Sequence, residues 1–154
     1  MNYSSIIIAL LVAMIGVTVA SAEDNPFFGS WKVVSSTLWP DYDSGPLPKV
    51  DPELDGKTII FAPNQAKGSC VVECEKPLYR LYTDDTPESL FQGTLKNPAK
   101  DAVTLGFKGD KIVTMHESCD SSTGDMYLDF HMVDHSTILL GINGRIYTLK
   151  RQSE

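Results

Sequence analysis

Beyond residue 30, short runs of apolar, β-branched and aromatic residues are separated by turn-forming residues along the whole chain. Within several runs, apolar and polar positions alternate, which is typical of strands with one buried face. We interpret seven runs as strands: 31–38, 57–61, 78–83, 111–116, 125–132, 137–140 and 146–149. Many short strands at close spacing predict a mainly β fold, either a barrel or a sandwich.

Turn and cap residues refine this pattern. Asn143-Gly144 lies between the last two runs, and such a pair predicts a hairpin because a type I′ turn needs positive φ at both central residues. Thr86-Pro87-Glu88 and Asn97-Pro98 each place a proline directly after a cap residue, which predicts one or two short helices. The segment 39–56 holds four prolines and predicts a loop.

The first 22 residues differ from the rest in composition. An uncharged apolar run from Ile6 to Val19 is followed by Ala20-Ser21-Ala22. The run is shorter than the roughly 20 residues of a membrane-spanning helix, and the small-residue step is typical of a signal-peptide cleavage site. We therefore expect a signal peptide over 1–22 and one mature domain over 23–154, either periplasmic or secreted. Cleavage would leave no stable membrane anchor; the alternative is a retained N-terminal anchor.

The chain carries a net charge of -7, and none of its charged side chains lies in residues 1–22. An acidic surface repels phosphate backbones and anionic lipid headgroups, which argues against nucleic-acid and membrane-surface partners. The same charge would favour a cationic protein target, although it also serves solubility.

The three cysteines are Cys70, Cys74 and Cys119. In an oxidising compartment two should pair. Along an extended strand the Cα atoms of Cys70 and Cys74 would lie about 13 Å apart, too far for a disulfide. We prefer a long-range bridge between Cys74 and Cys119. Zinc is disfavoured because the second ligand pair of a structural site is missing.

Histidines supply the remaining candidate chemistry. Asp129 and His131 share one strand face, and His116 could lie opposite on a neighbouring strand. An acid–base or metal role for these three competes with the simpler interpretation of solvent-exposed polar residues. Because no catalytic or metal motif is complete, we predict no enzyme activity, no metal site and no cofactor.

Gly29-Ser30-Trp31 resembles the G-x-W that opens the first strand of lipocalin-like (calycin) barrels. The resemblance implies a single antiparallel up-and-down barrel of about eight strands. It also implies that a basic residue of the last strand packs across the tryptophan ring, and Arg145 is the candidate for this cation–π contact. It also implies a non-catalytic module that binds a small apolar ligand inside the barrel; the alternative is an interior filled by side chains. The candidate ligand-contacting residues are Trp39 and Tyr42 in a lid and Phe61, Tyr79, Tyr82 and Met126 in the wall.

A second resemblance is to a group of small exported bacterial proteins without an assigned role. The matching positions are Cys74, Tyr79, Leu90-Phe91-Gln92-Gly93, Leu105-Gly106, Cys119, Phe130-His131 and Arg145-Ile146-Tyr147. This resemblance supports the Cys74–Cys119 pairing and leaves Cys70 unpaired. The competing functional hypothesis is a periplasmic inhibitor of a hydrolase, either a protease or a lysozyme, that inserts a loop into a target cleft.

Overall fold

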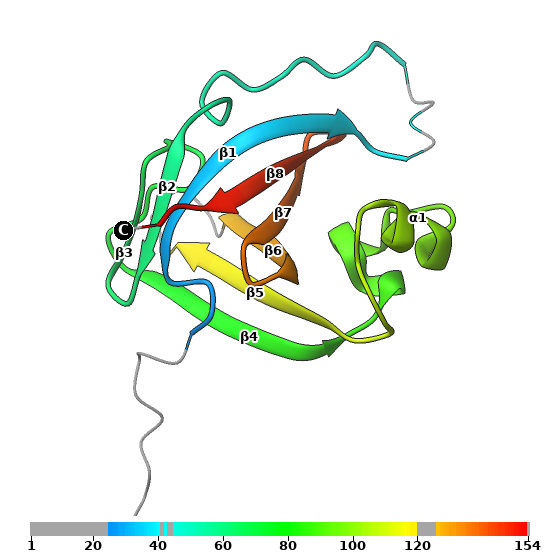
Figure 1. Cartoon of the computed structure of the whole chain (residues 1–154). Helices are drawn as coiled ribbons and strands as arrows, with labels where there is room; N and C mark the ends of the chain where they lie inside the picture. Colours follow the sequence, from blue (N-terminus) through cyan, green and yellow to red (C-terminus); the bar gives the residue numbers. More distant parts are fainter. Residues whose placement is uncertain (1–24, 41, 43–44, 120–125, 154) are drawn as a thin grey trace, which may run out of the picture.

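The computed structural model describes residues 25–40, 42, 45–119 and 126–153, so the expected signal peptide lies outside the described residues. Eight antiparallel strands and two short helical segments make up this part of the chain (Figure 1). In chain order they are β1 Gly29–Leu38, β2 Thr58–Ala62, β3 Gln65–Lys67, β4 Pro77–Asp85, η2 Pro87–Gly93, α1 Pro98–Thr104, β5 Ile112–Cys119, β6 Met126–Asp134, β7 Thr137–Ile142 and β8 Arg145–Arg151.

The strands form one sheet in the order β3-β2-β1-β8-β7-β6-β5-β4. Because β1 pairs with β8, the sheet curls into a nearly closed up-and-down barrel with a seam between β3 and β4. The mainly β prediction is confirmed. Both helical segments begin at the predicted prolines, and the final hairpin turns at Asn143 and Gly144, which both have positive φ. None of the described helices has the length and apolarity that crossing a membrane requires.

A disulfide joins the two sides of the seam. Cys74 follows β3, with which it forms an isolated bridge at Ala66, and it is bonded to Cys119 at the end of β5, with a Cα–Cα distance of 5.8 Å. Cys119 in turn pairs with Pro77 at the start of β4. The predicted pairing is confirmed, and Cys70 is a free, exposed thiol.

Large side chains occupy the inward face of the sheet. Phe61 on β2 and Phe130 on β6 are not on neighbouring strands, yet their rings meet at 4.8 Å across the barrel. The largest fully buried side chains of this interior cluster are Trp31, Tyr147, Phe27, Phe61, Phe130, Leu54, Ile59, Met115, Ile138 and Leu140. Of the two interpretations of the interior, this arrangement supports the filled one.

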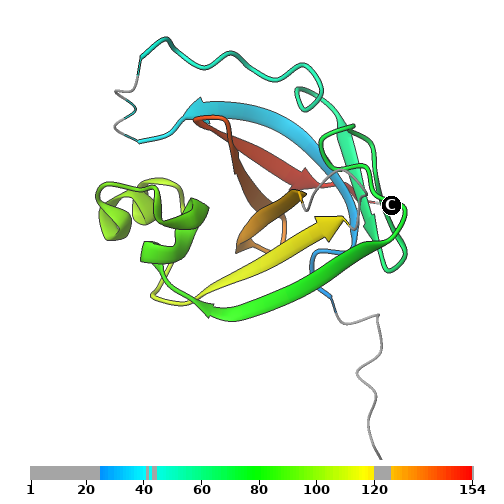
Figure 2. The same cartoon turned by 180° about the vertical axis from the view of Figure 1, so that it is seen from behind.

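A second apolar cluster lies on the outward face. Leu139 and Ile146 alternate along their strands with the inward residues Leu140 and Tyr147, so they point away from the barrel interior. They pack against Leu90 and Phe91 of η2 and neighbouring residues of the β4–β5 crossover. Both views show the two helical segments gathered on one side of the barrel (Figures 1 and 2).

The expected contact between Trp31 and Arg145 is wrong, and Arg151 takes that place. In the antiparallel register Trp31 pairs with Arg151, whereas Arg145 pairs with Leu38 at the far end of β1. The Arg151 guanidinium lies 4.1 Å from the centroid of the Trp31 ring. Gly29 has a φ of 120°, and a Cβ there would meet the Arg151 side chain at 3.0 Å, so this glycine makes room for the arginine.

Arg145 instead fixes the opposite end of the hairpin. Its guanidinium donates to the Ser36 hydroxyl at 3.0 Å and to the carbonyl of Pro48 at 2.9 Å. It therefore ties the proline-rich segment to β1 and β8.

Candidate ligand-binding groove

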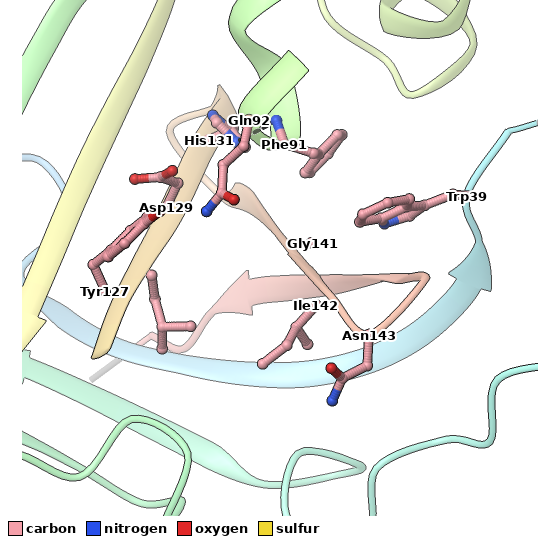
Figure 3. A pocket seen from close by; sticks show the side chains of 10 residues that line it. Trp39, Phe91, Gln92, Tyr127, Asp129, His131, Gly141, Ile142 and Asn143 are labelled. Carbon is pink, nitrogen blue, oxygen red and sulfur yellow. Dashed lines mark hydrogen bonds between the residues drawn. The ribbon is translucent and has the colours of Figure 1, made fainter. Parts of the chain in front are cut away.

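Two adjoining hollows, each of about 260 Å³, lie beside β6, mostly on its outward side; the first also reaches Leu128 and Ile142 at the margin of the interior cluster. They share Tyr127, Asp129 and His131, and we call them together the outer groove. The first, the Trp39 hollow, is lined by Trp39, Phe91, Gln92, Tyr127, Leu128, Asp129, His131, Gly141, Ile142 and Asn143 (Figure 3). The second, the His116 hollow, is lined by Tyr82, Asp85, Ser89, Thr114, His116, Tyr127, Asp129 and His131.

A tight turn inside η2 covers one side of the Trp39 hollow. Phe91 and Gln92 have φ values of 50° and 61°, and Gly93 follows at 72°. Left-handed backbone is uncommon for a bulky residue and typically costs about 1–3 kcal/mol, so the surrounding structure must hold it in place. The turn aims the Gln92 side chain into the hollow (Figure 3).

Two contacts hold this turn. The backbone N–H of Phe91 donates to Nε2 of His131 at 3.2 Å, and the two rings meet edge to face at 4.9 Å. The Phe91 ring also lies so close to β7 that a Cβ on Gly141 would stand 2.4 Å from it. Glycine is therefore required at position 141 by the close approach of the phenyl ring, not by backbone conformation.

His131 is an anchor whose two ring nitrogens are both engaged. It is 1% exposed, and burial lowers the pKa of its imidazole from 6.5 to about 4, so the ring is neutral near pH 7. Since Nε2 accepts from Phe91, Nδ1 carries the proton and donates to the Thr114 hydroxyl at 2.9 Å. The interpretation of this histidine as a solvent-exposed polar residue is wrong, because η2 covers it.

His116 and Asp129 form a second pair on β5 and β6. Their Nδ1 and Oδ1 atoms lie 2.8 Å apart, with side chains 24% and 19% exposed. The His116 ring stacks on Tyr127 at 5.1 Å, and Tyr82 approaches it edge-on at 6.5 Å. Within the described residues, no group of three His, Cys, Asp or Glu side chains could hold a metal ion.

The aliphatic hydroxyl groups of the His116 hollow, on Ser89 and Thr114, already have partners. Ser89 donates to the carbonyl of Thr86 at 2.8 Å and accepts from its N–H at 3.2 Å, closing the first turn of η2. Thr114 accepts from His131. A histidine–carboxylate pair can move a proton.

The sequence-predicted contact residues divide between the two faces of the barrel. Trp39 lines the Trp39 hollow, with its indole N–H donating to the carbonyl of Arg145 at 3.1 Å, and Tyr82 lines the His116 hollow. Phe61 is 1% exposed in the interior, where the half-buried Tyr79 packs edge-on against it. Tyr42 lies against Gly144 at the hairpin tip.

The Met126 side chain lies outside the described residues, although its backbone begins β6. Sequence reasoning missed Phe91, Gln92, Tyr127 and Asn143 as groove residues. Leu90-Phe91-Gln92-Gly93 was visible as a motif, but its left-handed turn was not, and Asn143 signalled only a hairpin.

No protein-family model matches the chain, and neither does any curated protein or solved structure. The nearly closed antiparallel barrel is consistent with a calycin-like architecture on its geometry alone.

Proposed function

We propose that this protein is an exported, non-catalytic binding module that holds one small molecule with a largely apolar body in the outer groove. The supporting observation is the Phe91–Gln92 turn, a strained backbone segment held by a buried histidine over a hollow. Strain of this kind is usually retained where a site needs it. The two hollows together reach the size of ordinary small-molecule sites.

The lining suits an amphipathic molecule. Trp39 and Phe91 offer apolar surface, while the amides of Gln92 and Asn143 have no intramolecular hydrogen bond among the described residues and remain available to a ligand. A few polar groups in a mostly apolar cleft fix the orientation of a ligand. The disulfide is compatible with export, and the Gly29–Trp31–Arg151 corner supports a proposed lipocalin-like kinship. In this proposal the ligand lies outside the barrel, not within it.

Native mass spectrometry of the protein isolated from its source organism tests this function. We expect a small-molecule adduct on the wild-type chain that is weakened by Trp39→Ala and by Asn143→Gly. Glycine suits the positive φ of residue 143, so the second variant removes an amide without disturbing the hairpin. Leu78→Ala is the control, because Leu78 is 60% exposed and lines neither hollow. An adduct that survives both groove variants would overturn the proposal.

A hydrolase inhibitor is the second candidate, and the proline-rich segment favours it. Leu47 is 71% exposed and Val50 40% exposed in this segment, on a chain of net charge -7. An exposed apolar loop on an acidic protein suits a cationic protein target. A co-purified protein whose retention is lost in Leu47→Ala, with no small-molecule adduct, would favour this function.

A further inference from the structure

We propose that the ligand of the outer groove carries a protonated amine, which is seated in the His116 hollow between Tyr82, Tyr127 and the carboxylates of Asp85 and Asp129. This inference rests on the proposed function and specifies the class of small molecule. A cation is attracted both by carboxylates and by the faces of aromatic rings, and cages of aromatic rings recognise alkylammonium groups.

A β-bulge places Asp85 in this hollow. On β4 the register shifts between Tyr82, which pairs with Thr114, and Asp85, which pairs with Ile112. Without the extra residue, Asp84 would stand opposite Ile112 and face the hollow instead. Bulges of this kind re-aim a side chain and are frequent beside functional sites. As a result Asp85 is half-buried and lines the hollow, whereas Asp84 is 77% exposed and pairs with Lys111 at 3.1 Å.

Histidine is the only basic residue type that the described lining sets against these carboxylates. Among the described residues that line either hollow, none is lysine or arginine. Asp129 bonds to His116, and no ion pair of Asp85 occurs among the described residues. Both carboxylates act on the neighbouring His131, where their charge raises its pKa against the larger lowering by burial. Two acidic groups therefore converge on one partly enclosed space.

The rings complete the arrangement. Tyr82 and Tyr127 flank the hollow on either side of His116, with centroid distances to its ring of 6.5 Å and 5.1 Å. Both tyrosines retain exposed surface, 44% and 49% respectively, so they can contact an incoming group. A ligand with its ammonium group in this hollow would extend its apolar body along Tyr127 towards Trp39, because the two hollows share Tyr127.

Three probes of one shape and different charge test the inference: 2-phenylethylamine, 2-phenylethanol and 3-phenylpropionate. Each is titrated into the full mature protein while NMR follows the indole N–H of Trp39 and the side-chain amides of Gln92 and Asn143. We expect saturable shifts with the amine, an affinity for the alcohol about tenfold weaker, and no measurable binding of the carboxylate.

Two substitutions remove the same charge at neighbouring positions. They distinguish a cation bound in the His116 hollow from a general attraction of cations to the acidic surface. Asp85→Asn should weaken amine binding about five- to tenfold, while Asp84→Asn should change it less than about twofold, because Asp84 is solvated and screened. Equal losses in the two variants would overturn the inference, and so would equal affinity for the amine and the alcohol. In the second case the groove still binds, so the proposed function survives. The proposed function is tested separately, by native mass spectrometry of the adduct and of its loss in Asn143→Gly.

Discussion

The two faces of this sheet are built in different ways. The inward face is filled by fully buried large side chains, with the disulfide and the Arg151–Trp31 stack at its margins. The outward face carries a buried apolar cluster where the helical segments cover it, and beside this cluster lie a strained turn, a buried histidine and two hollows. A ligand inside the barrel was the expectation, whereas the described side chains fill the inward face and the candidate site lies beside the helical segments.

In our proposal this difference separates stability from ligand binding. Close packing in the interior stabilises the barrel, and truncation there leaves a cavity that the structure cannot easily fill. The outer groove keeps the left-handed backbone of Phe91 and Gln92, which lowers stability and is typical of functional sites. Substitutions in the interior should therefore affect unfolding, and substitutions in the groove should affect ligand retention.

Truncation of Trp31 should have the largest effect. Trp31 is fully buried, and its indole N–H donates to the carbonyl of Phe27 at 2.7 Å. We expect Trp31→Ala to lower the free energy of unfolding by about 3–5 kcal/mol, and Arg151→Ala by about 1 kcal/mol. In a double-mutant cycle measured by denaturant unfolding, the two losses should not add, because both remove the same contact. Trp31→Ala and Arg145→Ala are the control pair and should add.

Loss of the disulfide should follow closely. Cys74 and Cys119 close a loop with a sequence separation of 45 across the seam of the barrel. Loop entropy assigns such a bridge about 4 kcal/mol, so the double variant Cys74→Ala/Cys119→Ala should unfold at much lower denaturant concentration. The exposed Cys70 supplies the control, since Cys70→Ser should leave the midpoint unchanged. An unchanged midpoint in the double variant would mean that packing alone closes the seam.

Local signals predicted the fold well because they act over a few residues. Asn143-Gly144 encodes its own hairpin, and the two prolines mark helix starts without reference to the rest of the chain. β3 was missed because three residues are too few for a periodic pattern. The sequence alone does not show that Arg151, and not Arg145, meets Trp31, because the register of two strands far apart in sequence decides this contact.

The groove was harder to predict because its parts are joined by tertiary structure. The alternation along β6 correctly separates Phe130 from His131, but only η2 turns the outward side of that strand into a buried surface. Asp84 and Asp85 are indistinguishable in sequence until a bulge selects one of them. Trp39 was found because it is an aromatic residue at the edge of a proline-rich loop.

Two buried titratable groups, one on each face, should give opposite pH dependences. Burial raises the pKa of the inward Glu117 from 4.5 to about 7, so the native state keeps a proton that the unfolded chain releases, and stability falls as pH rises through this window. Burial lowers the pKa of the outward His131 to about 4, so stability falls as pH drops from 6.5 towards 4. The free energy of unfolding of the wild type should therefore change little between pH 4.5 and pH 6.5, where the two dependences oppose each other.

Glu117→Gln removes one of the two opposing pH dependences and leaves that of His131. The variant should gain stability relative to the wild type as pH rises to 8, by as much as about 3 kcal/mol if each pKa unit contributes about 1.4 kcal/mol. Denaturant unfolding from pH 4 to pH 8 measures both profiles. A wild type that loses stability steeply between pH 5 and 7, or a variant with an equally flat profile, would contradict this assignment of the two faces.

The last prediction concerns Gly141, which joins the groove to the barrel wall. A Cβ at this position would lie 2.4 Å from the buried Phe91 ring, so Gly141→Ala must displace the ring and the turn that carries Gln92. Overpacking of this kind typically lowers the free energy of unfolding by about 1–3 kcal/mol. The same displacement should weaken the native adduct, which sets this variant apart from interior truncations. The double variant Gly141→Ala/Phe91→Leu should recover part of the stability, because the smaller side chain relieves the clash. A Gly141→Ala protein with unchanged unfolding and full ligand retention would show that the turn tolerates displacement, and the strained turn would then no longer support a site in the groove.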